Sequence, residues 1–102
     1  MDTLTDIVAE EVRWYTAGGQ GARIQLYFVS DVENRVYAVN AVPSPARQLA
    51  SNVVVLAHIV GDSVVVEEDR TDRPLVDRLM ARGIPREKIV LAYAGETVMQ
   101  PE

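Results

Sequence analysis

The segment from Val53 to Val66 constrains the fold more than any other part of the chain. It reads VVVLAHIVGDSVVV, and β-branched residues dominate both arms around Gly61-Asp62. Such residues favour strands, and a short Gly-Asp connection favours a tight turn, so the segment predicts a hairpin. The first arm, Val53 to Val60, is apolar on both faces. It is therefore either a central strand covered on each side or a strand whose second face meets a partner.

The chain before this hairpin predicts a helix followed by another hairpin. Apolar residues recur at gaps of three and four from Thr3 to about Tyr15, so a helix is expected there, with Thr3 as its cap and the glycines at 18, 19 and 21 as its end. From Arg23 the period changes to two, and a turn over residues 31–34 separates this strand from a second one over Val36 to Val42. Pro43-Ser44-Pro45 ends that strand, and a polar connection over residues 46–52 follows.

The chain after the central hairpin predicts a second helix and a last strand. Thr71 or Asp72 is the expected cap, and Gly83 and Pro85 end the helix. Its expected buried stripe is Leu75, Val76, Leu79 and Met80, and its water-facing residues are Asp77, Arg78 and Arg82. Lys88 to Tyr93 forms the final strand. The order helix, hairpin, hairpin, helix, strand predicts one α+β domain over residues 1–102, with a mostly antiparallel sheet of four to five strands and helices packed on one face.

Composition limits the classes of function. Ten Lys and Arg against fifteen Asp and Glu give a net charge of −5, which argues against direct binding to nucleic acid because phosphate affinity comes mainly from cationic side chains. The chain has no cysteine, so disulfides, thiolate nucleophiles and cysteine-based zinc sites are excluded. Neither a signal peptide nor a membrane-spanning run is recognisable, and a cytoplasmic location is expected.

No residues are arranged for catalysis, and the expectation is a protein that is not an enzyme and uses no metal or cofactor. His58 is the only histidine, so an interface or structural role is favoured over that of a general base or metal ligand. Glu67, Glu68 and Asp69 form a dense acidic stretch that lacks calcium-loop spacing, and a solvated connection accounts for it better than a cation site. The candidate interface residues are instead aromatic or amphipathic: Trp14, Tyr27, His58 and Tyr93.

The second half of the chain resembles the XisI family, the fdxN element excision controlling factors. The resemblance rests on the hairpin turn Gly61-Asp62, the connection Asp69-Arg70-Thr71-Asp72, and the stretch GIPREKIVL at residues 83–91. The stretch IQLYFVSDVENRVYAV at residues 24–39 is similar to the family's first hairpin. Val42-Pro43 replaces a Gly-Trp pair that is usual in the family, so the chain resembles a divergent or short member.

This resemblance implies an accessory, regulatory role in programmed DNA excision, beside a site-specific recombinase and with an XisH-like protein as partner. It implies no catalytic residues. A homo-oligomer, most simply a dimer, is also expected from the apolar strand with two apolar faces. The alternatives are direct DNA binding during excision and, less favoured, a small ligand-binding domain with a pocket that gathers His58, Tyr27 or the acidic stretch.

Overall fold

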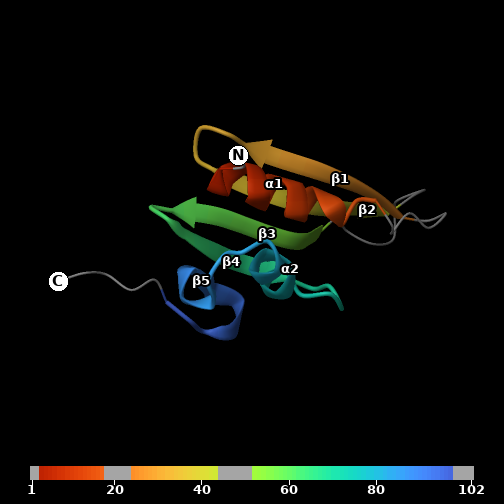
Figure 1. Ribbon diagram of the computed structural model, residues 1–102. Coiled ribbons are helices and arrows are strands. Elements are labelled where there is room, and N and C mark those ends of the chain that lie inside the picture. The colour runs from red at the N-terminus through yellow and green to blue at the C-terminus, as the bar shows by residue number, and fades with distance from the viewer. Residues whose placement is uncertain (1–2, 18–23, 44–51, 98–102) are drawn as a thin grey trace.

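The computed structural model describes residues 3–17, 24–43 and 52–97 of the chain. The predicted glycine linker after the first helix and the predicted polar connection up to residue 51 lie outside the described residues. Within them, five strands and two helices follow one another in the expected order (Figure 1). No helix in this part of the chain is long and apolar enough to cross a membrane.

Helix α1 spans Leu4–Trp14 and begins as the sequence predicts. The backbone N–H of Asp6 donates to the Thr3 hydroxyl at 3.2 Å, and the Asp6 carboxylate accepts from the Thr3 backbone at 3.3 Å. This reciprocal pair is a capping box, which satisfies two backbone N–H groups that would otherwise lack partners. Val8 and Val12 on one face of the helix are fully buried.

The sheet contains β1 (Ile24–Asp31), β2 (Val36–Pro43), β3 (Asn52–Val60), β4 (Ser63–Asp69) and β5 (Ile89–Leu91), in that spatial order. The first four strands form an antiparallel meander, and β5 joins β4 in parallel. The parallel step is possible because α2 connects β4 to β5 as a crossover. The predicted α+β class, with a mostly antiparallel sheet, is therefore confirmed.

Helix α2 spans Leu75–Ala81 and departs from the prediction in three respects. Neither Thr71 nor Asp72 caps it, because the chain enters the helix at Pro74, which has no side-chain cap bond. Met80 is 44% exposed rather than buried, whereas Leu75 and Leu79 are fully buried and Val76 packs partly against the core. Arg78 and Arg82 do not simply face water, since both bind a buried carboxylate on α1.

The last strand is also shorter than predicted. Gly83, at φ 95°, takes the left-handed conformation that ends α2 as expected. The predicted strand from Lys88 to Tyr93 is reduced to Ile89–Leu91, because one-turn 3-10 helices, η1 (Arg86–Lys88) and η2 (Ala92–Ala94), occupy its flanks.

Both helices lie on one face of the sheet, where they enclose the core (Figure 1). The core combines α1, α2 and alternate residues of the three central strands, which follows from the period of two along each strand. Its buried members are Val8, Val12, Tyr37, Val39, Val55, Ala57, Ile59, Val64, Val66, Leu75, Leu79, Ile84 and Ile89. Neither described helix covers the opposite face, which is called the open face below.

Candidate interaction surfaces

The open face is mostly apolar and crosses all five strands. Paired residues in a sheet share a face, and the register places Val29 opposite Ala38, Ala38 opposite Leu56, and Val65 opposite Val90. The apolar residues on the open face include Tyr27, Val29, Val36, Ala38, Leu56, Val60, Val65 and Val90. Its polar residues include Gln25, Asn40, His58, Ser63, Glu67 and Glu68. Strand β3 is a central strand with apolar residues on both faces, as predicted, and the described helices cover only one of them.

Exposure on this face is uneven. Tyr27 and Val29 on β1 are 52% and 53% exposed, whereas Ala38, Val65 and Val90 are buried. Val60, at the end of β3, is also exposed. The accessible apolar surface is thus concentrated on the edge strand β1 and at the end of β3 beside the turn to β4.

His58 and Glu67 form a hydrogen-bonded pair on this face. The His58 Nε2 atom is 2.8 Å from a carboxylate oxygen of Glu67, and both side chains keep part of their surface in water. Glu67 reaches the histidine because β4 contains an irregularity in register between the partners of Leu56 and Ala57. A hydrogen-bonded pair of this kind can remain on a surface that a partner covers, because the polar atoms already have partners.

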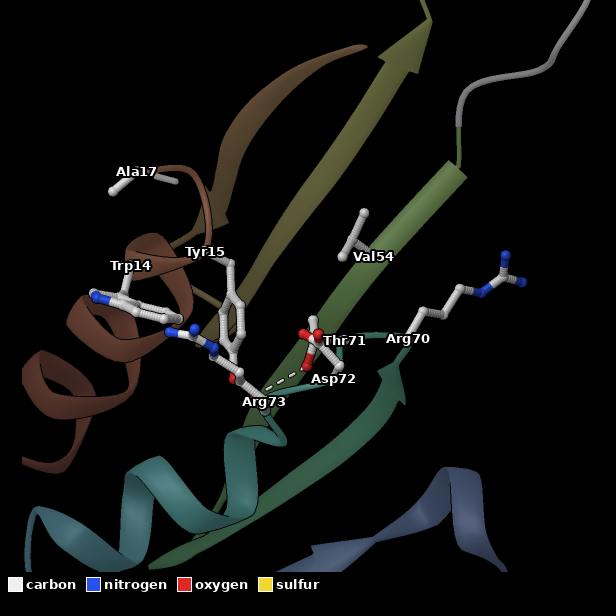
Figure 2. Close-up of a pocket in the computed structure, with 8 residues that line it drawn as sticks. All are labelled: Trp14, Tyr15, Ala17, Val54, Arg70, Thr71, Asp72 and Arg73. Atoms are coloured by element: carbon white, nitrogen blue, oxygen red, sulfur yellow. Dashed lines mark hydrogen bonds between the residues drawn. The ribbon is translucent and has the colours of Figure 1, made fainter. Parts of the chain in front are cut away.

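The helix side of the molecule carries an open recess between the end of α1 and the connection from β4 to α2 (Figure 2). The recess has a volume of about 670 Å³, with an aromatic wall of Trp14 and Tyr15 and a polar wall from the connection. It is lined by Trp14, Tyr15, Ala17, Val54, Arg70, Thr71, Asp72 and Arg73. His58, Tyr27 and the three acidic residues of the predicted ligand pocket are not among these residues.

Two arginines bind Trp14 by cation–π contact at this recess. The Arg78 guanidinium carbon lies 3.6 Å from the indole ring centroid, and that of Arg73 lies 5.8 Å from it. The Tyr15 hydroxyl donates to the backbone carbonyl of Arg73. These contacts attach the β4–α2 connection to the end of α1, so Trp14 and Tyr15 have a structural role whether or not a partner contacts them.

Burial raises the pKa of the Tyr15 hydroxyl to about 12, with nearby Asp69 adding to the effect. Because the folded pKa lies above the unfolded value of about 10, the folded state holds this proton more tightly and its contribution to stability is lost as the pH rises from 10 through 12. Burial also raises the pKa of Tyr93. We therefore expect the tyrosinate absorbance at 295 nm to show a late-ionising fraction to which both Tyr15 and Tyr93 contribute. In Tyr15→Phe the amplitude of the late fraction should fall by one tyrosine, and an unchanged late amplitude would contradict the assignment.

The acidic stretch at the end of β4 does not converge on one point. Glu67 binds His58, and Glu68 accepts from Arg70 Nε at 2.7 Å. Asp69 instead accepts from Thr71 and from the backbone N–H of Leu75. The three carboxylates therefore have separate partners, and no group of three or more potential metal ligands occurs within the described residues.

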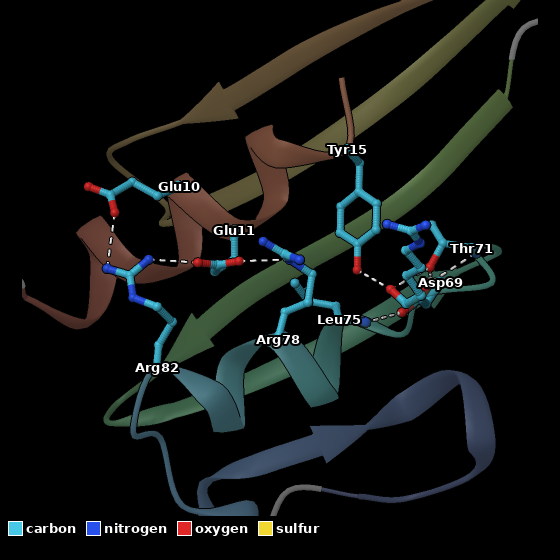
Figure 3. A network of polar contacts seen from close by, with 9 residues as sticks. Glu10, Glu11, Tyr15, Asp69, Thr71, Leu75, Arg78 and Arg82 are labelled. Atoms are coloured by element: carbon cyan, nitrogen blue, oxygen red, sulfur yellow. Dashed lines mark hydrogen bonds and ion pairs between the residues drawn. The ribbon is translucent and has the colours of Figure 1, made fainter. Parts of the chain in front are cut away.

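A buried ionic network joins the two helices, and the sequence analysis missed it (Figure 3). Glu11 is only 7% exposed, and its two carboxylate oxygens accept from Arg78 Nε at 2.8 Å and from an Arg82 terminal nitrogen at 2.6 Å. The other Arg82 terminal nitrogen donates to Glu10 at 3.0 Å. A signal was present, because residue 11 lies one turn from Val8 and Tyr15 on the apolar stripe of α1, where a charged side chain needs a partner.

The four predicted interface residues do not form one surface. Tyr27 and His58 share the open face, on β1 and β3. Trp14 lies on the helix side at the recess. Tyr93 lies in η2, beyond the last strand, and is 44% exposed. The open face therefore unites two of the four predicted interface residues.

Comparison with known proteins agrees with this architecture. The family model of the XisI protein matches residues 1–101. Two solved structures share the fold: an XisI-like protein from Anabaena variabilis and the fdxN element excision controlling factor XisI from the same organism. The XisI-like protein has a TM-score of 0.77 and 22% sequence identity, and the match covers 87% of this chain and 85% of that protein. The excision controlling factor has a TM-score of 0.64 and 17% sequence identity, and the match covers 88% of this chain and 85% of that protein. No curated protein matches. The chain belongs to the XisI family.

Proposed function

We propose that this protein is a non-enzymatic regulatory factor of programmed DNA excision that binds an XisH-like protein beside a site-specific recombinase. We further propose that it works in the cytoplasm as a homodimer. Membership of the XisI family supports the regulatory role, and one structural neighbour is named an excision controlling factor. The XisH-like partner is what the resemblance to the family implies, and the apolar character of both faces of β3 supports the dimer.

The open face is the observation that carries this proposal. Its accessible apolar side chains are Tyr27 and Val29 on β1 and Val60 at the end of β3, and neither described helix packs on it. Apolar surface released from water stabilises an interface by about 25 cal/mol per Å² before the costs of association. We assign this face to the XisH-like protein.

The charges of the described residues disfavour DNA as the direct ligand. Arg70, Arg78, Arg82, Arg86 and Lys88 each contact a carboxylate of the same chain. A cation that is already neutralised gains little from a phosphate, and the chain carries a net charge of −5. A protein partner therefore agrees better with the surface than a nucleic acid does.

The test is copurification with the XisH-like protein encoded in the same organism, followed by titration with variants. We expect Val60→Asp to weaken binding at least about tenfold, because it places a charge in the contact surface, where desolvation costs on the order of 1–3 kcal/mol. Val60 is an informative position because it is 43% exposed in the free protein, so the substitution should leave the fold intact.

Met80→Asp is the matched control. Met80 is exposed to the same extent, 44%, but lies on α2 on the opposite side of the sheet. It should bind the XisH-like protein as the unmodified chain does. Failure of the unmodified chain to coelute with that protein would refute the proposed partner, and equal weakening by both variants would refute the assignment of the open face.

A further inference from the structure

The two edges of the sheet differ in how their backbone groups are used. At β5 the Ile89 carbonyl accepts from Arg86 at 2.7 Å, and the Leu91 N–H donates to the Glu96 carboxylate at 2.9 Å. The Glu96 N–H in turn donates to the Leu91 carbonyl, and Arg86 and Glu96 pair at 2.7 Å. This edge is three residues long and is closed to a further strand.

The β1 edge has none of these protections among the described residues. It is eight residues long, pairs only with β2, and contains neither proline nor lysine. Its one charged residue, Asp31, is at its end. Tyr27 and Val29 are more than half exposed beside the unpaired backbone. A long, uncharged edge offers every second N–H and C=O to another strand, which proteins normally prevent unless the edge is used.

We propose that β1 pairs with β1 of a second copy, antiparallel, about a two-fold axis through Tyr27. The inference rests on the proposed self-association and names its surface. The two five-stranded sheets join into one ten-stranded sheet with the helices of both copies on the same side. The open faces of the two copies become continuous and remain available to the XisH-like partner.

The strand is self-complementary in this register. Tyr27 meets its own counterpart, Leu26 meets Phe28 twice on the helix side, and Gln25 meets Val29 twice on the open face. Leu26 and Phe28 already pack against the core, so their contact extends the apolar layer across the new boundary. Ile24 through Ser30 pairs completely with itself, which leaves Asp31 outside the ladder and avoids a buried charge.

Disulfide trapping tests both the surface and the register, because the chain has no cysteine of its own. In Tyr27→Cys the two thiols face each other across a strand pair, at a Cα separation of about 4.5–5.5 Å, which a disulfide spans. We expect most of the full-length chain to become a covalent dimer under mild oxidation, as seen on non-reducing gels.

Val29→Cys is the matched control, because Val29 is exposed to the same extent on the same strand. Its counterpart lies four residues away along the strands, about 13 Å, which exceeds the reach of a disulfide. It should stay uncrosslinked alone, whereas a mixture of Gln25→Cys and Val29→Cys chains should crosslink. Equal crosslinking of Tyr27→Cys and Val29→Cys alone would indicate random collision and overturn the proposed pairing.

The mass of the unmodified chain in solution, from light scattering, distinguishes a failure of the proposed β1 pairing from a failure of self-association as such. A dimer whose Tyr27→Cys variant does not crosslink would overturn the β1 pairing but leave self-association intact. A monomer at high micromolar concentration would overturn both, while copurification with the XisH-like protein would still test the regulatory proposal. A dimer that crosslinks through Tyr27→Cys supports both.

Discussion

Glu11→Ala is expected to lower the free energy of unfolding by about 3 kcal/mol. The substitution removes a buried carboxylate whose two oxygens bind Arg78 and Arg82, so two half-buried guanidinium groups lose their common partner. Arg78 keeps its cation–π contact with Trp14 and Arg82 keeps Glu10, but both guanidinium groups retain their desolvation cost with much less compensating attraction. Urea denaturation, followed by circular dichroism, measures the change as a lower midpoint at constant slope.

Glu10→Ala is the control that distinguishes the effect of burying a carboxylate from the effect of its charge alone. Glu10 is the neighbouring carboxylate, binds Arg82 from the exposed side of α1, and keeps more than half of its side chain in water. Exposed ion pairs contribute about 0–1 kcal/mol, so this variant should be nearly as stable as the unmodified chain. A loss at Glu10 comparable to that at Glu11 would contradict the view that the buried position of Glu11 holds the two helices together.

Most of the secondary structure could be predicted from the sequence because it depends on interactions between residues that are close in the chain. The Thr3–Asp6 capping box, the turn at Gly61-Asp62 and the end of α2 at Gly83 each depend on residues within a few positions of one another. Alternation along the strands likewise predicts which face of β3 carries His58, since the period of two is a property of the backbone. These predictions needed no knowledge of tertiary contacts.

The missed contacts join residues that are distant in sequence. Glu11 and Arg78 are separated by 67 positions, and each taken alone resembles an ordinary charged residue on the surface of a helix. Trp14 shows the same limit, because its contacts with Arg73 and Arg78 depend on where α2 packs. Sequence reasoning identified Trp14 and Tyr27 as candidate contacts but could not place them on opposite sides of the sheet.

The edge strand illustrates a further limit. The sequence of β1 alternates like an ordinary half-buried strand, and nothing in it distinguishes an edge from a centre. The distinction came from topology, because β5 joins the far side of β4 and, within residues 3–17, 24–43 and 52–97, no strand pairs with the other side of β1. The proposed dimer surface therefore became visible only once the order of the strands was known.

Asp69→Ala is expected to destabilise the protein by about 2 kcal/mol, because Asp69 supplies the cap that sequence spacing assigned to Thr71 or Asp72. One carboxylate oxygen accepts from the Leu75 N–H at 2.7 Å, the first N–H of α2, and the other accepts from the Thr71 N–H at 3.0 Å and from its hydroxyl at 2.6 Å. The substitution removes the acceptor of the Leu75 and Thr71 backbone N–H groups, whereas the Thr71 hydroxyl can still donate to the Arg73 carbonyl at 3.0 Å. Thermal and urea unfolding both report the loss.

Asp72→Ala is the comparison that decides which residue is the cap. Asp72 is exposed, and its carboxylate makes no hydrogen bond or ion pair within the described residues, so its removal should change the free energy of unfolding by less than about 0.5 kcal/mol. The contrast follows from geometry, because Pro74 fixes an extended entry to α2 and only the end of β4 brings a carboxylate to the Leu75 N–H. An equal loss of unfolding free energy in both variants would instead indicate that Asp72 caps α2 as the sequence spacing predicted.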